Sequence, residues 1–396
     1  MINLTDLLDV HKIYNSSLYI ENNHIIDMPL ATYIGKDAGK EPIWLNPIAP
    51  SGFGKTTAIL PLLDLAFDWK NPTDKENILN KKYDIYFVDD ITSATFGSGS
   101  ASKSKEGDLG HWLQDRNTLL IISDLSPILT MDSDSKNKLF GKFRTLYDGY
   151  IKVDTGAGNK FYQNIHMNML AFATAEARRH LDLHTSLGTR EITYEIPKTK
   201  NIYEALLKKD TKEDRENRSN IVKEFIDDLH LDWKFAEEQL ERDSHILIDL
   251  SEKISYWRAA PVTDENGYLS QHVEPEYPMR VKNQLESLYK AFVVIGVNNP
   301  LGRLIEIVNT CGNPVRREIL SKMFVVENDS YVSKDRLVNS YYLSHNLGLS
   351  PKIILTNLFV LRDMNLVKPV VEEEEKYSKK IDFETVWFPL VRWSGM

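Results

Sequence analysis

Residues 48–57 constrain the fold of this chain more than any other stretch, because they read Ile-Ala-Pro-Ser-Gly-Phe-Gly-Lys-Thr-Thr. A short apolar run from Pro42 to Leu45 precedes them, and Ala58-Ile59-Leu60 follows as the expected start of a helix. A strand, a glycine-containing turn that ends in Gly-Lys-Thr and a helix together form a phosphate-binding loop, or P-loop. Small residues let successive backbone N–H groups turn toward phosphate oxygens, and the helix N-terminus adds its positive end.

The loop pattern also predicts the role of individual side chains. Lys55 would reach the β- and γ-phosphates of ATP, and the Thr56 hydroxyl would bind Mg²⁺. The strict pattern has glycine at position 49, where this chain has alanine, and that position needs only a small residue. Pro61 is expected to remove a backbone hydrogen bond from the following helix and to bend it. The alternative is a glycine-rich loop with a structural role. The predicted nucleotide-binding residues are Pro50, Ser51, Gly52, Phe53, Gly54, Lys55, Thr56 and Thr57.

The length and charge of the chain exclude several classes of protein. With 396 residues it is expected to bury a large core and to divide into two or three domains. A net charge of −9 argues against a chain-wide attraction to nucleic acid, so any DNA contact must be local. The single cysteine, Cys311, excludes a disulfide framework and a cysteine-rich zinc site. The N-terminus lacks the features of a signal peptide, and the longest apolar run, 291–297, is too short to span a bilayer. We therefore expect a soluble, cytoplasmic protein without membrane contact.

Apolar runs of strand length alternate with helical spacing after the P-loop. The helical spacing lies between them, in Leu139, Phe143, Leu146 and Tyr147. This alternation predicts a parallel α/β sheet with its ligand at the carboxyl ends of the strands. The runs are Tyr83 to Val88, Thr118 to Ser123, and Met167 to Ala173, and polar residues follow them: Asp89 and Asp90, Asp124, and Thr174.

Asp124 is the strongest candidate for the second half of the nucleotide site. A carboxylate at the end of a buried strand beside the P-loop would hold Mg²⁺ through water. The alternative is an aspartate that starts a turn, helped by Ser126 and Pro127. Many ATPases of this kind place a water-activating glutamate directly after the aspartate, whereas this chain has Leu125. The residue that activates the water is therefore either Asp89 or Asp90, or the site hydrolyses ATP slowly.

Four further residues are candidates for catalytic roles. Thr174, or Glu176 beyond it, would orient the attacking water. The alternative for Thr174 is a threonine in a turn at the strand end. Arg190 precedes a strand-like run and would reach the γ-phosphate of a neighbouring subunit. Arg280 opens a predicted helix and would touch the phosphates of its own subunit. The alternative for both arginines is a surface salt bridge.

The C-terminal half is predicted to be mainly helical. The mixed charge run 208–216 is interpreted as a solvated helix face or linker, and helical patterns follow it up to Ile295. Three helices followed by a β-hairpin together predict a winged helix. The helices are expected at Val315 to Phe324, from Ser333, and at Ser350 to Asp363. The hairpin strands are expected at Leu366 to Val371 and Thr385 to Phe388.

DNA contact by this C-terminal block is one of two alternatives. Lys352 and Arg362 would bind DNA phosphates. In the expected wing, however, Glu372 to Glu375 would repel phosphates. The lysines that follow them, Lys376, Lys379 and Lys380, make the local charge mixed. The other interpretation is a winged helix that binds protein or only packs. Within the ATPase core, the loop with Lys103 and Lys105 is the preferred DNA contact, against a flexible solvated loop.

Several motifs together resemble a known group. These are Pro-x-Trp-Leu at 42–45, Asp-Asp-Ile-Thr-x-Ala-Thr-Phe at 89–96, Leu-Ile-Ile-x-Asp-Leu-Ser-x-Ile-Leu-x-Met at 120–131, Leu-Tyr-Asp-Gly at 146–149, Ser-Leu-Gly-x-Arg at 186–190 and Pro-x-Arg at 278–280. From about Trp44 to Val297 the chain resembles P-loop ATPases encoded on phages, plasmids and integrated elements. That group is similar to the AAA+ helicases of replication, including the minichromosome maintenance type.

The resemblance implies roles for particular residues. An apolar residue such as Leu125 is common after the aspartate in this group. Arg190 would be an arginine finger and Arg280 a second sensor. Members of the group usually have Gly-Glu-Arg where this chain has Gly188-Thr189-Arg190, with Glu191 after the arginine.

The expected fold is therefore an α/β P-loop NTPase of the AAA+, ASCE-like type, with a parallel sheet, a helical lid and a C-terminal winged helix. The expected segments are an N-terminal helical segment (1–40), the ATPase core (41–197), the lid (198–311) and the winged helix (312–396). The expected function is Mg²⁺-dependent ATP hydrolysis coupled to work on DNA in mobile-element replication, as helicase, initiator or loader. Because an arginine finger acts on the nucleotide of a neighbouring subunit, we expect a homo-oligomer in the form of a hexameric ring. The alternatives are a slowly hydrolysing nucleotide switch that recruits proteins, and a transcription regulator.

Overall fold

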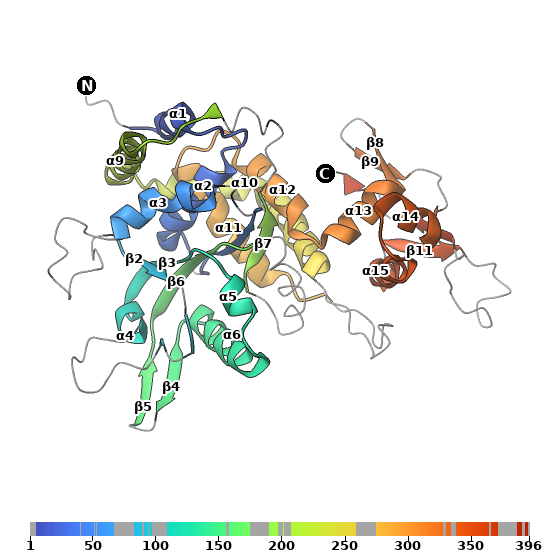
Figure 1. Ribbon diagram of the computed structural model, residues 1–396, viewed down its shortest axis with the longest axis horizontal. Coiled ribbons are helices and arrows are strands. Elements are labelled where there is room, and N and C mark those ends of the chain that lie inside the picture. Colours follow the sequence, from blue (N-terminus) through green and yellow to red (C-terminus); the bar gives the residue numbers. More distant parts are fainter. Residues whose placement is uncertain are drawn as a thin grey trace. The chain divides into compact units, whose positions relative to one another are not determined.

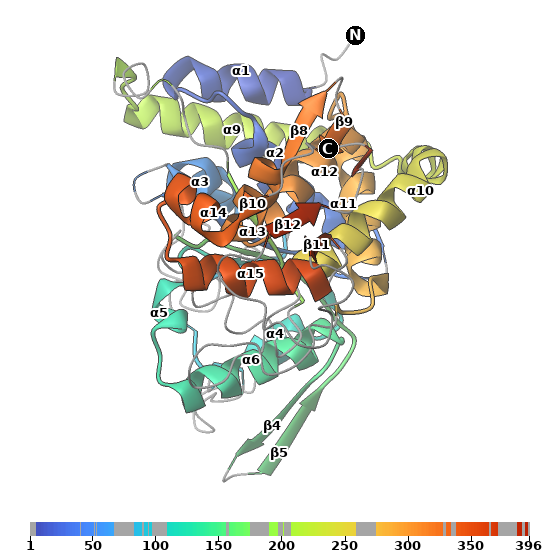
Figure 2. The same ribbon diagram turned by 90° about the vertical axis from the view of Figure 1, so that its right-hand side faces the viewer.

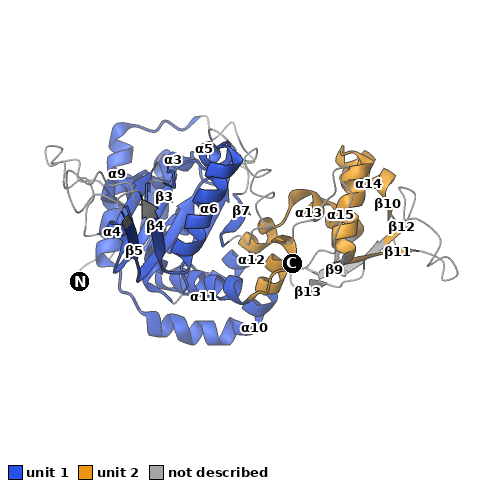
Figure 3. Cartoon of the chain, turned by 90° about the horizontal axis from the view of Figure 1, so that it is seen from below, with its two compact units in different colours: residues 1–181, 190–249, 279–304 blue, residues 182–189, 250–278, 305–396 orange. Residues whose placement is uncertain are grey.

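The computed structural model describes most of the chain, and the described residues divide into two units, coloured separately in Figure 3. Unit 1 comprises residues 1–181, 190–249 and 279–304, and unit 2 comprises residues 182–189, 250–278 and 305–396. The described residues are 5–39, 41–50, 52, 54–66, 83–88, 91–93, 95–96, 109–155, 158–174, 190–196, 201, 207–258, 275–327, 330–333, 338–363, 366–370, 386–389 and 393–394.

A five-stranded parallel sheet forms the centre of unit 1 (Figure 1). Its order is β2-β3-β6-β1-β7, and every neighbouring pair is parallel. Because the strands are parallel, all five carboxyl ends lie at one edge, here named the carboxyl edge, and the opposite edge is the amino edge. The predicted parallel α/β sheet is thereby confirmed. The strands are β1 Trp44–Ile48, β2 Ile85–Val88, β3 Arg116–Ile122, β6 Ile165–Ala171 and β7 Ile192–Glu195.

Helices accompany this sheet because the chain alternates strand-length and helical apolar patterns. In α6 the spaced apolar residues Leu139, Phe143, Leu146 and Tyr147 are all buried, as the spacing predicts. Asp132 caps the start of this helix by accepting a hydrogen bond from the backbone N–H of Ser135. The helices of unit 1 are α1 Leu7–Ser17, α2 His24–Ile34, the 3₁₀ helix η1 Gly35–Asp37, α3 Lys55–Ala66, α4 Leu109–Leu113, α5 Ser126–Leu129, α6 Ser133–Tyr147, α9 Lys212–Asp228 and α11 Met279–Val294.

An antiparallel hairpin, which the sequence analysis did not anticipate, lies between α6 and β6. It consists of β4 Ile151–Thr155 and β5 Gly158–Tyr162, and in Figure 2 it extends away from α4 and α6. The side chains of Ile151 and Val153 are buried in the core, because alternate residues of a strand point to one face. Tyr162 also packs there, and its ring fills the space above Gly110 of α4, where a Cβ atom would lie 2.4 Å from it. The base of the hairpin is therefore fixed to the core.

Two helices contribute residues to both units. These are α10 Trp233–Arg258 and α12 Pro300–Cys311, so the segment expected as a lid, 198–311, is divided between the units. The charge run 208–216 leads into α9, which begins with a capping box between Thr211 and Asp214. Among the residues that the structure describes, no helix combines the length and apolar character needed to cross a bilayer.

The described residues of unit 2 contain three whole helices, besides parts of α10 and α12, and two antiparallel sheets of three strands each. The expected hairpin is confirmed, since β11 pairs antiparallel with β12. The expected helix from Ser333 is wrong: a hairpin of β8 and β9 occupies this region, and the helix begins at Ser340, capped by Asn339. The acidic and basic wing residues 372–376, 379 and 380 lie outside the described residues. The elements are α13 Pro314–Met323, β8 Phe324–Glu327, β9 Ser330–Ser333, β10 Val338–Asn339, α14 Ser340–Leu347, α15 Pro351–Asp363, β11 Val367–Val370, β12 Val386–Pro389 and β13 Trp393–Ser394.

Candidate functional site

The turn between β1 and α3 has the backbone conformation that its glycines permit. Gly52 has a φ of +76° and Gly54 a φ of +85°, values that residues with a Cβ atom rarely adopt. The helix α3 begins directly afterwards at Lys55, and the N–H of Ala58 donates to the carbonyl of Gly54 over 3.0 Å. The N–H groups of the first helical turn have no acceptor within the helix, so they are available to an anion in the turn. Ser51 and Phe53 lie outside the described residues.

The ammonium group of Lys55 folds back over this turn. It donates to the carbonyl of Ala49 over 3.2 Å and to that of Ala173 over 3.4 Å. Partial burial lowers the pKa of Lys55 below its ordinary value, and the charge of Asp124 acts in the opposite sense. Asp124 is therefore near enough to act electrostatically on Lys55.

The end of strand β6 holds the two halves of the site together. On one side the N–H of Ala49 donates to the carbonyl of Ala173 over 3.2 Å. On the other side the N–H of Leu125 donates to the carbonyl of Phe172 over 2.8 Å. Because neighbouring strands lie about 4.8 Å apart, the start of the P-loop and the segment after β3 are separated by roughly 10 Å at the carboxyl edge. Backbone hydrogen bonds therefore set the spacing between the P-loop and Asp124.

Asp124 starts a turn with Ser126, as the structural alternative predicts. It also lies at the carboxyl edge of the sheet, where a nucleotide-binding site requires it. Its Oδ1 atom accepts from the N–H of Ser126 over 2.8 Å and from the Ser126 hydroxyl over 2.7 Å. Within the described part of the chain, its other oxygen, Oδ2, accepts no hydrogen bond. The two bonds to Ser126 fix the orientation of the carboxylate and leave Oδ2 for a ligand.

Comparisons with known proteins add nothing to this geometry. No protein-family model matches the chain. A search among curated proteins gives no match either. The interpretation of the site therefore depends on its residues alone.

The remaining candidates at the carboxyl edge are only partly described. Thr174 directly follows Ala173, so it lies between the P-loop and Asp124 at the end of β6. Asp89, Asp90 and Glu176 lie outside the described residues, so the structure does not place the candidate bases. Among the residues that it describes, no group of three or more His, Cys, Asp or Glu side chains forms a metal site by itself. A Mg²⁺ ion here would need Thr56, Asp124, water and the phosphates as its ligands.

Arg190 and Arg280 lie together at the amino edge of the sheet. Their guanidinium groups lie 5.9 Å and 5.8 Å from the centre of the Tyr147 ring, within the range of cation–π interactions. Arg190 also pairs with Asp148, with 3.3 Å between Nη2 and Oδ2. The Tyr147 ring packs edge-on against the ring of Trp44, the first residue of β1, at 5.2 Å between centroids.

A buried glutamine joins Arg190 to the start of β1. Gln284 of α11 accepts from the N–H of Trp44 over 3.1 Å and donates to the carbonyl of Arg190 over 2.6 Å. From Trp44 to the end of β1 the strand runs for roughly 13 Å. The structure thus brings Lys55, Asp124 and Thr174 together at one edge, and places Arg190 and Arg280 at the other.

The sequence analysis missed the residues that hold these arginines. Tyr147 and Asp148 belong to the Leu-Tyr-Asp-Gly motif at 146–149, to which the sequence analysis assigned no role. The chain turns at Gly149, which has a φ of +88°. An aromatic residue at the last position of an amphipathic helix was the available signal. For Gln284 the helical spacing of the apolar residues around it was the signal, since a polar residue on that face is buried.

The outer face of the β4–β5 hairpin carries exposed aromatic rings next to a lysine. Tyr150 and Phe161 have ring centres 6.1 Å apart and are 39% and 58% exposed. Lys152 lies directly opposite Phe161 in the strand register and is also exposed. We name these three residues the hairpin face. The expected DNA-contact lysines, Lys103 and Lys105, lie outside the described residues.

Proposed function

We propose that the chain is a Mg²⁺-dependent ATPase of the P-loop class. One observation carries this proposal: Ala49 and Leu125 bond to successive residues at the end of β6, so that Lys55 and Asp124 lie at the same edge. The left-handed Gly52 and Gly54 support it, because they let the backbone close around phosphate oxygens. The sheet order, with β6 between the P-loop strand and the aspartate strand, supports the AAA+, ASCE-like subdivision.

Except for the base, the proposed chemistry uses residues that the structure describes. The first-turn N–H groups of α3 bind phosphate oxygens, and Lys55 exchanges its two carbonyl acceptors for the β- and γ-phosphates. Phosphate oxygens are stronger acceptors for an ammonium group than neutral carbonyls are. Mg²⁺, when bound, neutralises charge on the phosphates, and Thr56 and the Oδ2 atom of Asp124 would hold it. Thr174 orients the attacking water, and Asp90 is the proposed base.

The position of the two arginines favours action on a second copy of the chain, which for Arg280 differs from the expected contact with the phosphates of its own subunit. Arg190 and Arg280 lie near Trp44, roughly 13 Å along β1 from the P-loop of their own chain. A guanidinium group in this position is better placed to contact a nucleotide bound to a neighbouring subunit than one bound to its own subunit. We therefore propose a homo-oligomer, expected to be a hexameric ring, in which Tyr147 and Asp148 hold Arg190 ready for the adjacent site.

The hairpin face supports work on single-stranded DNA. Exposed aromatic rings give stacking platforms for bases, and a neighbouring lysine attracts the phosphate backbone. Such a contact is local, as the net charge of −9 requires. We propose that this cytoplasmic ATPase acts as helicase, initiator or loader in replication of a mobile element. The helices α13, α14 and α15 and the β11–β12 strand pair of unit 2 would be its winged helix.

One observation favours a second candidate, a slowly hydrolysing nucleotide switch. Leu125 occupies the position after Asp124 and is buried, so it offers no base there. ATP turnover by wild type and by the Lys55→Ala variant, across a titration with single-stranded DNA, separates the two. A motor requires turnover that rises with DNA and disappears in the variant. A switch requires ATP binding with turnover that DNA does not change.

A further inference from the structure

The P-loop helix is interrupted close to the residues that would bind ATP. Pro61 lies inside α3 and has no N–H, so the carbonyl of Thr57 lacks its usual donor four residues later. The first turn, which carries Lys55 and Thr56, is therefore held less firmly by its own helix. An outside contact at this turn would have a larger effect than in an uninterrupted helix.

Such a contact comes from the N-terminal helix α1. The hydroxyl of Tyr14 donates to the carbonyl of Ala58 over 3.0 Å, next to the position that Pro61 leaves without a donor. Tyr14 is only 2% exposed, and this burial raises the pKa of its hydroxyl, which therefore keeps the proton that it donates. Segment 1–40 had no chemical role in the sequence analysis, and this bond gives it one.

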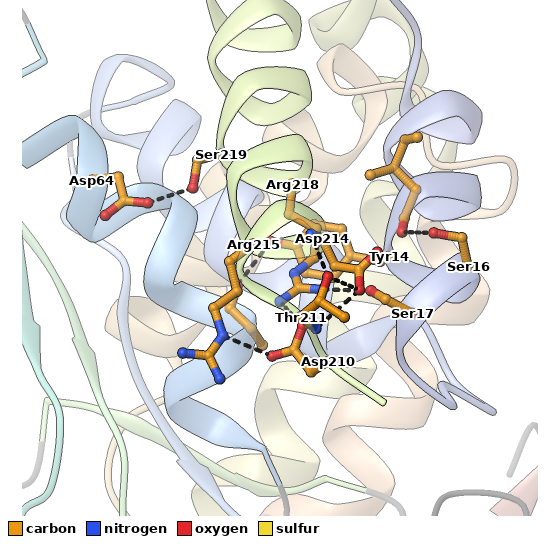
Figure 4. Close-up of polar contacts among 12 residues, drawn as sticks. Tyr14, Ser16, Ser17, Asp64, Asp210, Thr211, Asp214, Arg215, Arg218 and Ser219 are labelled. Atoms are coloured by element: carbon orange, nitrogen blue, oxygen red, sulfur yellow. Dashed lines mark hydrogen bonds and ion pairs between the residues drawn. The ribbon is translucent and has the colours of Figure 1, made fainter. Parts of the chain in front are cut away.

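Helix α9 holds Tyr14 in place and binds α3 a second time (Figure 4). The guanidinium of Arg218 lies 5.8 Å from the centre of the Tyr14 ring and is almost fully buried. It donates to Asp210 over 2.7 Å and to the hydroxyl of Ser17. The hydroxyl of Ser219 donates to Asp64. Side chains thus bind α3 at Ala58 and at Asp64, three residues before and three residues after Pro61.

We propose that Tyr14 is a positioning residue for the nucleotide site. Its hydrogen bond fixes the first turn of α3, and thereby Lys55 and Thr56, across the interruption at Pro61. This inference rests on the proposed function, because its consequence is measured as affinity for ATP. It also predicts a dependence on Pro61 that a tyrosine with only a packing role would not have.

The test is a double-mutant cycle between Tyr14 and Pro61. Tyr14→Phe keeps the ring and removes the hydroxyl, and it should weaken binding of Mg²⁺-ATP by about fivefold, as the loss of one buried hydrogen bond implies. Pro61→Ala restores the N–H, so in that background Tyr14→Phe should weaken binding by less than about twofold. Amide hydrogen exchange without nucleotide should accelerate at residues 56–62 in Tyr14→Phe, and less so in the double variant.

The outcomes separate this inference from the proposed function. An equal loss of affinity in both backgrounds, or unchanged exchange at residues 56–62, overturns the role of Tyr14 while ATP binding stands. If wild type gives no binding of Mg²⁺-ATP, the proposed function fails, and exchange alone then decides whether Tyr14 fixes this turn.

Discussion

The ammonium of Lys55 donates to the backbone carbonyl of Ala173 over 3.4 Å, across the boundary between the P-loop helix and strand β6. The adjacent carbonyl, that of Phe172, accepts from Leu125, directly after Asp124. The lysine and the carboxylate proposed to bind a nucleotide are therefore positioned by the same end of the same strand. Their relation depends on backbone hydrogen bonds of the sheet, so substitutions at the site should change binding more than folding.

Gly54→Ala should impair nucleotide binding while the fold persists. Nothing lies within 4 Å of a Cβ atom built at Gly54, so the variant suffers no collision. Its cost is the left-handed φ of +85°, about 1–2 kcal/mol for a residue with a Cβ atom, and the turn relieves it by changing shape. We expect a small decrease in melting temperature and a large loss of ATP affinity.

Gly141→Ala is the matched control for this substitution. Gly141 lies in α6, also with nothing within 4 Å of a built Cβ atom, and there alanine should stabilise the helix by up to about 1 kcal/mol. Nucleotide binding should be unchanged. Normal ATP affinity in Gly54→Ala would contradict the role assigned to the loop.

A mixture of two inactive variants should regain ATPase activity. Lys55→Ala removes the phosphate contact, and Arg190→Ala removes the arginine at the amino edge. If Arg190 acts on a neighbour, some interfaces of a mixed oligomer combine an intact Lys55 with an intact Arg190. Turnover measured against the mixing ratio should then pass through a maximum.

Two observations would count against this arrangement. One is a mixture that stays as inactive as its components. The other is an Arg190→Ala protein with wild-type turnover. Arg242→Ala is a suitable control, because Arg242 is an exposed arginine on α10.

Substitutions on the hairpin face should weaken binding of single-stranded DNA. Phe161→Ala removes an exposed ring and is expected to cost about 1–3 kcal/mol per stacked base. Lys152→Ala should lower the slope of log affinity against log salt by about 1, since one phosphate contact is lost. Fluorescence anisotropy with a labelled oligonucleotide measures both. Lys212→Ala, at a fully exposed lysine on α9, should behave as wild type. Equal affinity of all three variants would remove the hairpin from the DNA-binding surface.

The stability of unit 2 should rise with pH because of a buried lysine. Lys253 donates to Asn309 over 2.7 Å and is only 5% exposed, and burial lowers its pKa from 10.5 to about 7. Between these two values the unfolded chain binds more protons than the folded chain, so the free energy of unfolding increases with pH across this window. Below pH 7 both states carry the proton, and the dependence disappears.

Denaturant unfolding of wild type and Lys253→Met over pH 6 to 10 tests this assignment. The difference in unfolding free energy between the two proteins isolates the lysine from other titrating groups. We expect the wild type to gain stability relative to the variant as pH rises. Cys311→Ala is the control for the nearby thiol, because the charge of Cys311 acts on the pKa of Lys253. A difference that is constant with pH would refute the lowered pKa.

The parallel sheet was predictable because its inner strands are buried on both faces and therefore form largely apolar runs. Strand β3 shows this clearly, with Thr118 to Ile122 all buried. The hairpin of β4 and β5 was not predictable in the same way, because each strand has only five residues and exposed Lys152 lies between buried Ile151 and Val153. Short alternating segments that contain charged residues resemble loops in a single sequence.

The carboxyl edge of the site was also predictable, because parallel strands bring the residues after their carboxyl ends together. The separation of Lys55 from Arg190 and Arg280 depends instead on tertiary packing. Arg190 lies two residues before β7, and only the register of Leu45 with Ile192 places it at the amino edge. The bond from Tyr14 to Ala58 joins residues 44 positions apart and has no sequence signal.

Calorimetric titration of Mg²⁺-ATP into the wild-type protein, Lys55→Ala and Asp124→Asn tests the central claim most directly. We predict binding heat for wild type and none for Lys55→Ala. Asp124→Asn should bind ATP equally well with and without Mg²⁺, because the carboxylate that would hold the ion is lost. The absence of heat with wild type, or the same binding isotherm for all three proteins, would contradict the account.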